Sequence, residues 1–114
     1  MKIGEVSLNT NDVVALANFY KQLFGIDNGS NDAVHQVILS EGTWLTIYND
    51  GSEKRNDNEN ISLAFTVDDI ESEYQKLLAL GVEIIEKPTK RPWGNHKYEF
   101  LRPGQKYNLF QKFH

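Results

Sequence analysis

The stretch VSLNTNDVVALANFYKQLFG at residues 6–25 decides the fold, because it joins a strand pattern, a polar cap and an amphipathic helix that stops at Gly25. The same order returns as LAFTVDDIESEYQKLLALG at residues 63–81, where Gly81 supplies the stop. A unit repeated at half the chain length predicts two related modules that share one plan. The repeat therefore sets the architecture and the place where a site can form.

The first half begins with a half-buried strand. Residues 3–9 alternate, with Val6 and Leu8 on one face and polar side chains on the other, which is the period of two typical of a strand. Asn11 is placed to cap the following helix, whose apolar positions recur at three- and four-residue spacing up to the stop at Gly25. We expect this helix to cover the Val6 and Leu8 face.

Three more strands complete the first module. One is expected near Ile26, and two follow at residues 35–40 and 43–48. The dipeptide Glu41-Gly42 between the last two predicts a tight hairpin turn.

The second half repeats the plan after a polar connector at residues 51–60. A strand is expected at residues 61–67, and Asp68 with Glu71 forms a capping-box pattern before the helix that ends at Gly81. A loop is expected at residues 87–95, and further strands at residues 82–86, 96–101 and 106–113. The chain is thus predicted to be one α+β domain, residues 1–114, with β-α-β-β-β modules at about 1–50 and 61–114.

Composition excludes several classes of function. The chain has 114 residues, no cysteine and a net charge of −4 from 12 basic and 16 acidic residues, with no dense basic stripe. This pattern argues against nucleic-acid binding, disulfides and thiolate metal sites. No apolar run approaches the roughly 20 residues that cross a membrane, and no leader pattern opens the sequence. We expect a cytoplasmic protein without a membrane partner.

The sheet face opposite each helix can pack against the other sheet or line a cavity. A mix of aromatic, small and polar side chains is typical of small-molecule pockets. Strand alternation assigns such a mix to this inward face: Glu5, Ser7, Trp44, Thr46, Tyr48, Ser62, Ala64, Asn108 and Phe110.

Several of these residues admit two interpretations. Trp44, Tyr48 and Trp93 either form an aromatic wall that stacks a flat or cationic ligand, or pack in a core or a dimer interface. Glu5 is either a pocket carboxylate that recognises a cationic or hydrogen-bonding ligand, or a solvated residue at the rim. His96 either orients a ligand or acts as an acid or base, or is a surface histidine at a strand start.

Four segments, NFYKQLFG (18–25), VDDI (67–70), RPWG (91–94) and RPG (102–104), resemble in order and spacing the motifs of the vicinal oxygen chelate superfamily. This family contains glyoxalase I, fosfomycin and bleomycin resistance proteins, and extradiol dioxygenases. The resemblance covers almost the whole chain. It implies that the sheets of the two modules pair into a half-open, mixed-sheet barrel around a cavity, in a protein that forms a homodimer.

The resemblance also implies where metal ligands would stand, namely at Glu5, at Thr46 or Tyr48, at Ser62 and at Asn108. Glu5 alone is a good ligand, since hydroxyl and amide oxygens are weak substitutes for the imidazole and carboxylate groups that hold divalent transition metals. We therefore expect no metal and no cofactor.

The favoured function is that of a metal-free glyoxalase/bleomycin-resistance-like protein that binds a small organic ligand between its sheets. The alternative is a divalent-metal-dependent enzyme with a degenerate metal site, either a lactoylglutathione-lyase-like lyase or a dioxygenase. The sequence leaves open whether the chain is an enzyme. The expected ligand-binding residues are Glu5, Trp44, Thr46, Tyr48, Ser62, Trp93, His96 and Asn108.

Overall fold

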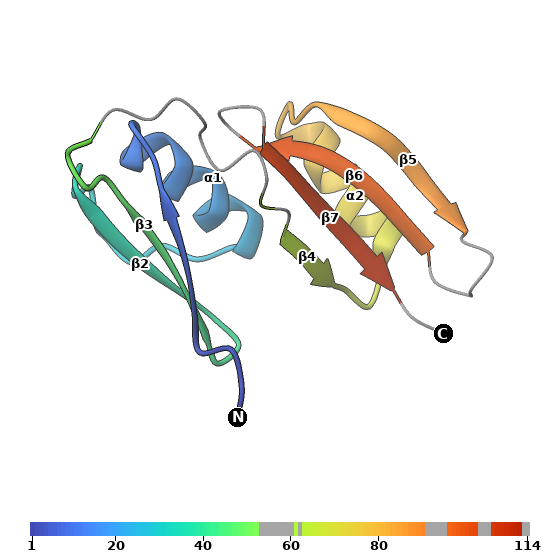
Figure 1. Ribbon diagram of the computed structural model, residues 1–114. Coiled ribbons are helices and arrows are strands. Elements are labelled where there is room, and N and C mark those ends of the chain that lie inside the picture. Colours follow the sequence, from blue (N-terminus) through green and yellow to red (C-terminus); the bar gives the residue numbers. More distant parts are fainter. Residues whose placement is uncertain (53–60, 62, 91–95, 103–105, 113–114) are drawn as a thin grey trace. The chain divides into compact units, whose positions relative to one another are not determined.

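The computed structural model describes residues 1–52, 61, 63–90, 96–102 and 106–112, and from residue 86 onward it describes the backbone of the strands alone. The chain divides into two compact units, Met1–Asn58 and Glu59–His114 (Figure 1). Each unit combines helix and sheet, so the α+β class expected from the sequence is confirmed. No helix in the described part of the chain is both long and apolar enough to span a membrane.

The first unit is a three-stranded mixed sheet with one helix. Its elements are β1 (Glu5–Asn9), α1 (Val13–Phe24), β2 (His35–Ser40) and β3 (Thr43–Tyr48). The strand order is β1-β3-β2, with β1 parallel and β2 antiparallel to the central β3. The turn joining β2 to β3 has φ of 46° at Glu41 and 89° at Gly42. Two positive φ angles in a two-residue loop define the tight hairpin that the sequence predicted.

The core of the first unit lies between α1 and one face of this sheet. In β1 and β3 the buried apolar side chains are Leu8, Leu45 and Ile47, as the alternation predicted. Leu45 and Ile47 are two residues apart and Leu8 pairs with Ile47, so these three side chains share one face of the sheet. The helix contributes its own buried stripe, which consists of Val13, Leu16, Ala17, Tyr20 and Leu23.

The prediction of a strand near Ile26 is wrong, because residues 26–34 contain no strand. In this segment polar side chains accept hydrogen bonds from the backbone a few residues on. Asp27 Oδ1 accepts from Gly29 N at 2.8 Å, Asn28 Oδ1 from Ser30 N at 3.0 Å, and Asp32 Oδ1 from Val34 N at 2.7 Å. Such local bonds compete with a sheet ladder, so the first module is β-α-β-β.

Both helix caps lie one residue later than expected. Asp12, rather than Asn11, caps α1 by accepting a hydrogen bond from Ala15 N at 3.1 Å. In the second half Asp69, rather than Asp68, accepts from Ser72 N at 3.0 Å. Adjacent Asx residues offer equivalent chemistry, and only the position of the helix relative to its sheet chooses between them.

The second unit is β-α-β-β-β, as expected. Its elements are β4 (Leu63–Thr66), α2 (Ile70–Ala79), β5 (Ile84–Lys90), β6 (His96–Arg102) and β7 (Lys106–Lys112). The strand order is β4-β7-β6-β5. Strand β5 reaches into the expected loop at 87–95, with register shifts between Ile84 and Thr89. It lies at the edge of the sheet, where the missing N–H of Pro88 is tolerated.

The repeat in the sequence appears as a repeat in topology. In each unit the first strand pairs in parallel with the last, β1 with β3 and β4 with β7, and the remaining pairs are antiparallel. The pairing of the two sheets into a half-open barrel, the cavity between them and the homodimer stay predictions.

Candidate functional site

The face of the first sheet opposite α1 gathers side chains from all three of its strands. The register pairs Glu5 with Trp44, Ser7 with Thr46 and Asn9 with Tyr48. It also pairs Trp44 with Leu39, Thr46 with Val37 and Tyr48 with His35. Residues paired in this way share a face. We call this set the α1-distal face: Glu5, Ser7, Asn9, His35, Val37, Leu39, Trp44, Thr46 and Tyr48.

Four residues expected to bind a ligand lie together on this face, namely Glu5, Trp44, Thr46 and Tyr48. Their exposure differs in a way that suits a binding surface. Glu5 is exposed and the Trp44 side chain is 47% exposed, whereas Thr46 in the middle row is only 7% exposed. The surface therefore has a buried threonine at its centre, with an acidic group and an indole at one end.

Glu5 is held by a neighbour on its own strand. The Ser7 hydroxyl donates a hydrogen bond of 2.7 Å to Glu5 Oε1. The two residues are two positions apart and so share the face. One carboxylate oxygen is thereby fixed, beside the register partner Trp44.

His35 was missed as a member of this face. It is exposed and lies in register with Tyr48, at the opposite end of the face from Glu5. The signal was present, because the period of two along β2 puts His35, Val37 and Leu39 on one side. The connection of His35 to Tyr48, however, exists only through the hairpin register.

The remaining predicted residues belong to the second half. Ser62 and Trp93 lie outside the described residues. His96 is the first residue of β6, and its backbone lies in register with Lys90 of β5 and Lys112 of β7. Their expected roles in binding stay predictions.

Asn108 lies in β7, as expected, but its alignment with β4 differs from the prediction. The parallel register of β4 and β7 pairs Asn108 with Leu63 and Phe110 with Phe65. These partners alternate along β4 with Ala64, so the expected grouping of Asn108 and Phe110 with Ala64 is wrong. Local alternation gives the period of each strand, but the register between two distant strands depends on their pairing.

The donor groups on the α1-distal face fit a divalent metal poorly. Glu5 is its only carboxylate and already accepts the Ser7 hydroxyl, while His35 lies at the far end. Among the residues whose side chains are described, no three His, Asp or Glu come together in a group able to hold a metal ion. Such a site needs several imidazole or carboxylate ligands at once.

The comparisons with known proteins agree with the fold. The family model described as "Glyoxalase/Bleomycin resistance protein/Dioxygenase superfamily" matches residues 2–104. No curated protein sequence matches the chain.

Similar solved structures include a glyoxalase/bleomycin resistance protein/dioxygenase family enzyme from Burkholderia phytofirmans PsJN, with a TM-score of 0.82, 17% identity and full coverage of both chains. TioX from Micromonospora sp. ML1 has a TM-score of 0.79 and 15% identity, also with full coverage of both chains. A lactoylglutathione lyase from Agrobacterium tumefaciens has a TM-score of 0.76 and 17% identity over 97% of this chain and 92% of its own. At these identities the likeness shows a shared fold.

Proposed function

The chain belongs to the glyoxalase/bleomycin resistance protein/dioxygenase superfamily, and on that premise we propose that it binds a small organic ligand, without a metal, on the α1-distal face. The ligand is a planar aromatic compound that carries a positive charge or a hydrogen-bond donor. The observation that carries this proposal is the pairing of Glu5 with Trp44 in adjacent strands.

The geometry of that pair supports a cationic aromatic ligand. Neighbouring strands lie about 4.8 Å apart, so the carboxylate and the indole stand within reach of one small molecule. An indole face attracts a cation placed over it, and a carboxylate attracts it directly. Neither Glu5 nor Trp44 is buried, so water contacts both until a ligand displaces it.

The fixed orientation of Glu5 adds to the proposal. The hydroxyl of Ser7 donates a hydrogen bond to Glu5 Oε1, which leaves the other carboxylate oxygen of Glu5 for a donor on the ligand. A carboxylate held in one orientation before binding loses less conformational entropy when the ligand arrives. Trp44 and Tyr48 supply aromatic contact area along the same strand, on either side of the small Thr46.

Thermal unfolding with added compounds tests this function. Quinolinium, acridinium and phenanthridinium salts are added to the purified protein together with their neutral parent compounds. A ligand bound only by the native state raises the melting temperature in proportion to the logarithm of its concentration. We expect a rise with at least one of the cations. No rise with any compound, charged or neutral, would contradict the proposal.

The same assay addresses the alternative of a metal-dependent lyase or dioxygenase. Ni²⁺, Zn²⁺, Mn²⁺ and Fe²⁺ are each added at low concentration, with EDTA as the reference. We expect no rise in melting temperature, because Glu5 with neighbouring hydroxyls is a weak ligand set. A rise that grows with the concentration of one of these ions and is removed by EDTA would favour the metal-dependent alternative over ligand binding alone.

A further inference from the structure

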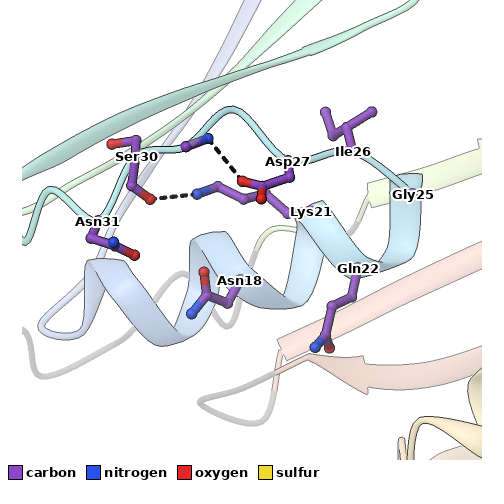
Figure 2. Close-up of a pocket in the computed structure, with 9 residues that line it drawn as sticks. Asn18, Lys21, Gln22, Gly25, Ile26, Asp27, Ser30 and Asn31 are labelled. Carbon is purple, nitrogen blue, oxygen red and sulfur yellow. Dashed lines mark hydrogen bonds between the residues drawn. The ribbon is translucent and has the colours of Figure 1, made fainter.

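A pocket of about 590 Å³ lies at the C-terminal end of α1, away from the α1-distal face (Figure 2). One wall is the last turns of α1 and the other is the segment that follows Gly25. We call it the α1 C-terminal pocket, and its lining is mostly polar: Asn18, Lys21, Gln22, Gly25, Ile26, Asp27, Gly29, Ser30 and Asn31.

Lys21 is the unusual residue of this pocket, because it is only 6% exposed. Lysine is almost never fully buried unless its charge is paired. Figure 2 shows Lys21 extending from α1 toward the loop, where its Nζ donates a hydrogen bond of 2.8 Å to the backbone oxygen of Ser30. An ammonium group has three N–H donors, so this bond uses one of them.

The described residues provide no other acceptor for the Lys21 ammonium, and none of their carboxylates lies within ion-pair distance of it. A buried ammonium group with no carboxylate within ion-pair distance is unfavourable, and an anion brought in by a ligand compensates it. The two unused donors belong to a residue that lines the pocket, so the anion has a place to bind.

We propose that the α1 C-terminal pocket is a second binding site, for a small organic monocarboxylate whose carboxylate group accepts hydrogen bonds from the Lys21 ammonium. Asn18 and Gln22 are exposed and lie about one turn apart on α1, and Asn31 lines the pocket from the segment that follows Gly25. Their amides both donate and accept hydrogen bonds. They therefore suit hydroxyl or amino groups on the rest of the ligand.

The charge of Asp27 limits the net negative charge of a ligand that the pocket can bind. Its carboxylate lines the pocket, and Oδ1 accepts from Gly29 N at 2.8 Å. A second negative charge opposes binding of polyanions, so the site favours a ligand with one carboxylate and a neutral or positive remainder. A hydroxy acid or an amino acid has this chemistry.

Titration of the ¹⁵N-labelled protein with acetate, glycolate, alanine and inorganic phosphate tests the site. We expect saturable shifts in the backbone amides of residues 25–31 with glycolate or alanine, and smaller shifts with phosphate. The wild-type titration needs no variant, so it stays decisive if a substitution unfolds the protein. No saturable shift in this segment with any carboxylate, or a response to phosphate alone, would overturn the proposal.

Two lysine-to-methionine variants provide a matched comparison, and a third variant removes the charge of Asp27. Lys21→Met should weaken the response at least tenfold, since it removes the ion pair. Lys2→Met removes the same charge from an exposed lysine and should leave the response unchanged. Asp27→Asn should strengthen binding of acetate by removing the like charge. Equal responses in folded Lys21→Met and Lys2→Met proteins would show that the pocket does not use Lys21 and would overturn the assignment.

Discussion

The Ser7 hydroxyl donates a 2.7 Å hydrogen bond to the Glu5 carboxylate, two residues back on the same strand. This hydrogen bond orients the exposed carboxylate of Glu5. Its register partner in the neighbouring strand is Trp44. Glu5 stands where the family resemblance places a metal ligand. In this chain its surroundings suit direct recognition of an organic ligand better than coordination of a metal.

Removing the charge of Glu5 should weaken binding of a planar aromatic cation more than removing its hydrogen-bond partner. We expect Glu5→Gln to lower affinity about three- to fivefold and Ser7→Ala about twofold, because exposed charge pairs contribute about 1 kcal/mol or less. Isothermal titration calorimetry measures both. Glu41→Gln removes the same charge from the hairpin turn, and a loss of affinity as large in this variant would rule out a local role for Glu5.

Single substitutions can show which residue caps α1. Asp12→Ala should lower the free energy of unfolding by about 1 kcal/mol, because Ala15 N loses its acceptor. Asn11→Ala, one residue earlier, should change it by less than about 0.5 kcal/mol. Urea unfolding monitored by circular dichroism makes the comparison. A larger loss for Asn11→Ala would reverse the assignment of the cap.

The hairpin turn between β2 and β3 contains a strained residue. Glu41 has φ of 46°, a left-handed conformation that costs a residue with a Cβ about 1–2 kcal/mol. Glu41→Gly should therefore raise the free energy of unfolding by about 0.5–1 kcal/mol, part of the relief being offset by the flexibility of glycine in the unfolded chain. Gly42→Ala, at φ of 89°, should lower it. Chemical unfolding of both variants checks the opposite signs.

Low pH should lower the free energy of unfolding by protonating Asp32, in the loop before β2. Hydrogen bonds from the backbone N–H groups of Val34 and His35 hold the pKa of Asp32 below its usual value. Because the folded-state pKa is the lower one, the stabilising contribution is present above about pH 4 and is lost as the pH falls through the folded-state pKa. The stability difference between wild type and Asp32→Asn should thus be larger at pH 6 than at pH 2. An unchanged difference would contradict this account.

Local patterns predicted much of the fold. The two amphipathic helices, the β2–β3 hairpin and the burial of Leu8, Leu45 and Ile47 on the helix side of the sheet all follow from spacing within one segment. Where neighbouring residues offered the same chemistry, as Asn11 and Asp12 do, spacing alone did not choose between them. Residues 26–34 failed as a strand because Asx side chains satisfied the backbone locally.

The site was harder to predict, since it depends on pairings between distant strands. The positions of Glu5 and Trp44 on one face follow from alternation, but their direct pairing comes from the parallel register of β1 and β3. The pairing of Asn108 with Leu63 depends in the same way on β4 and β7. The pocket around Lys21 could not be foreseen, because a lysine beside an apolar helical stripe gives no sign of whether its ammonium reaches solvent or a loop.

The most direct test of ligand binding on the α1-distal face uses Trp44 as the sole tryptophan. Trp93→Phe leaves Trp44 as the only indole in the chain, and its emission is followed as a quinolinium or acridinium salt is added, with correction for absorption. The account predicts saturable quenching that Glu5→Gln shifts to higher concentration. Quenching that stays linear with concentration, as from random collisions, and is indifferent to Glu5→Gln would contradict it.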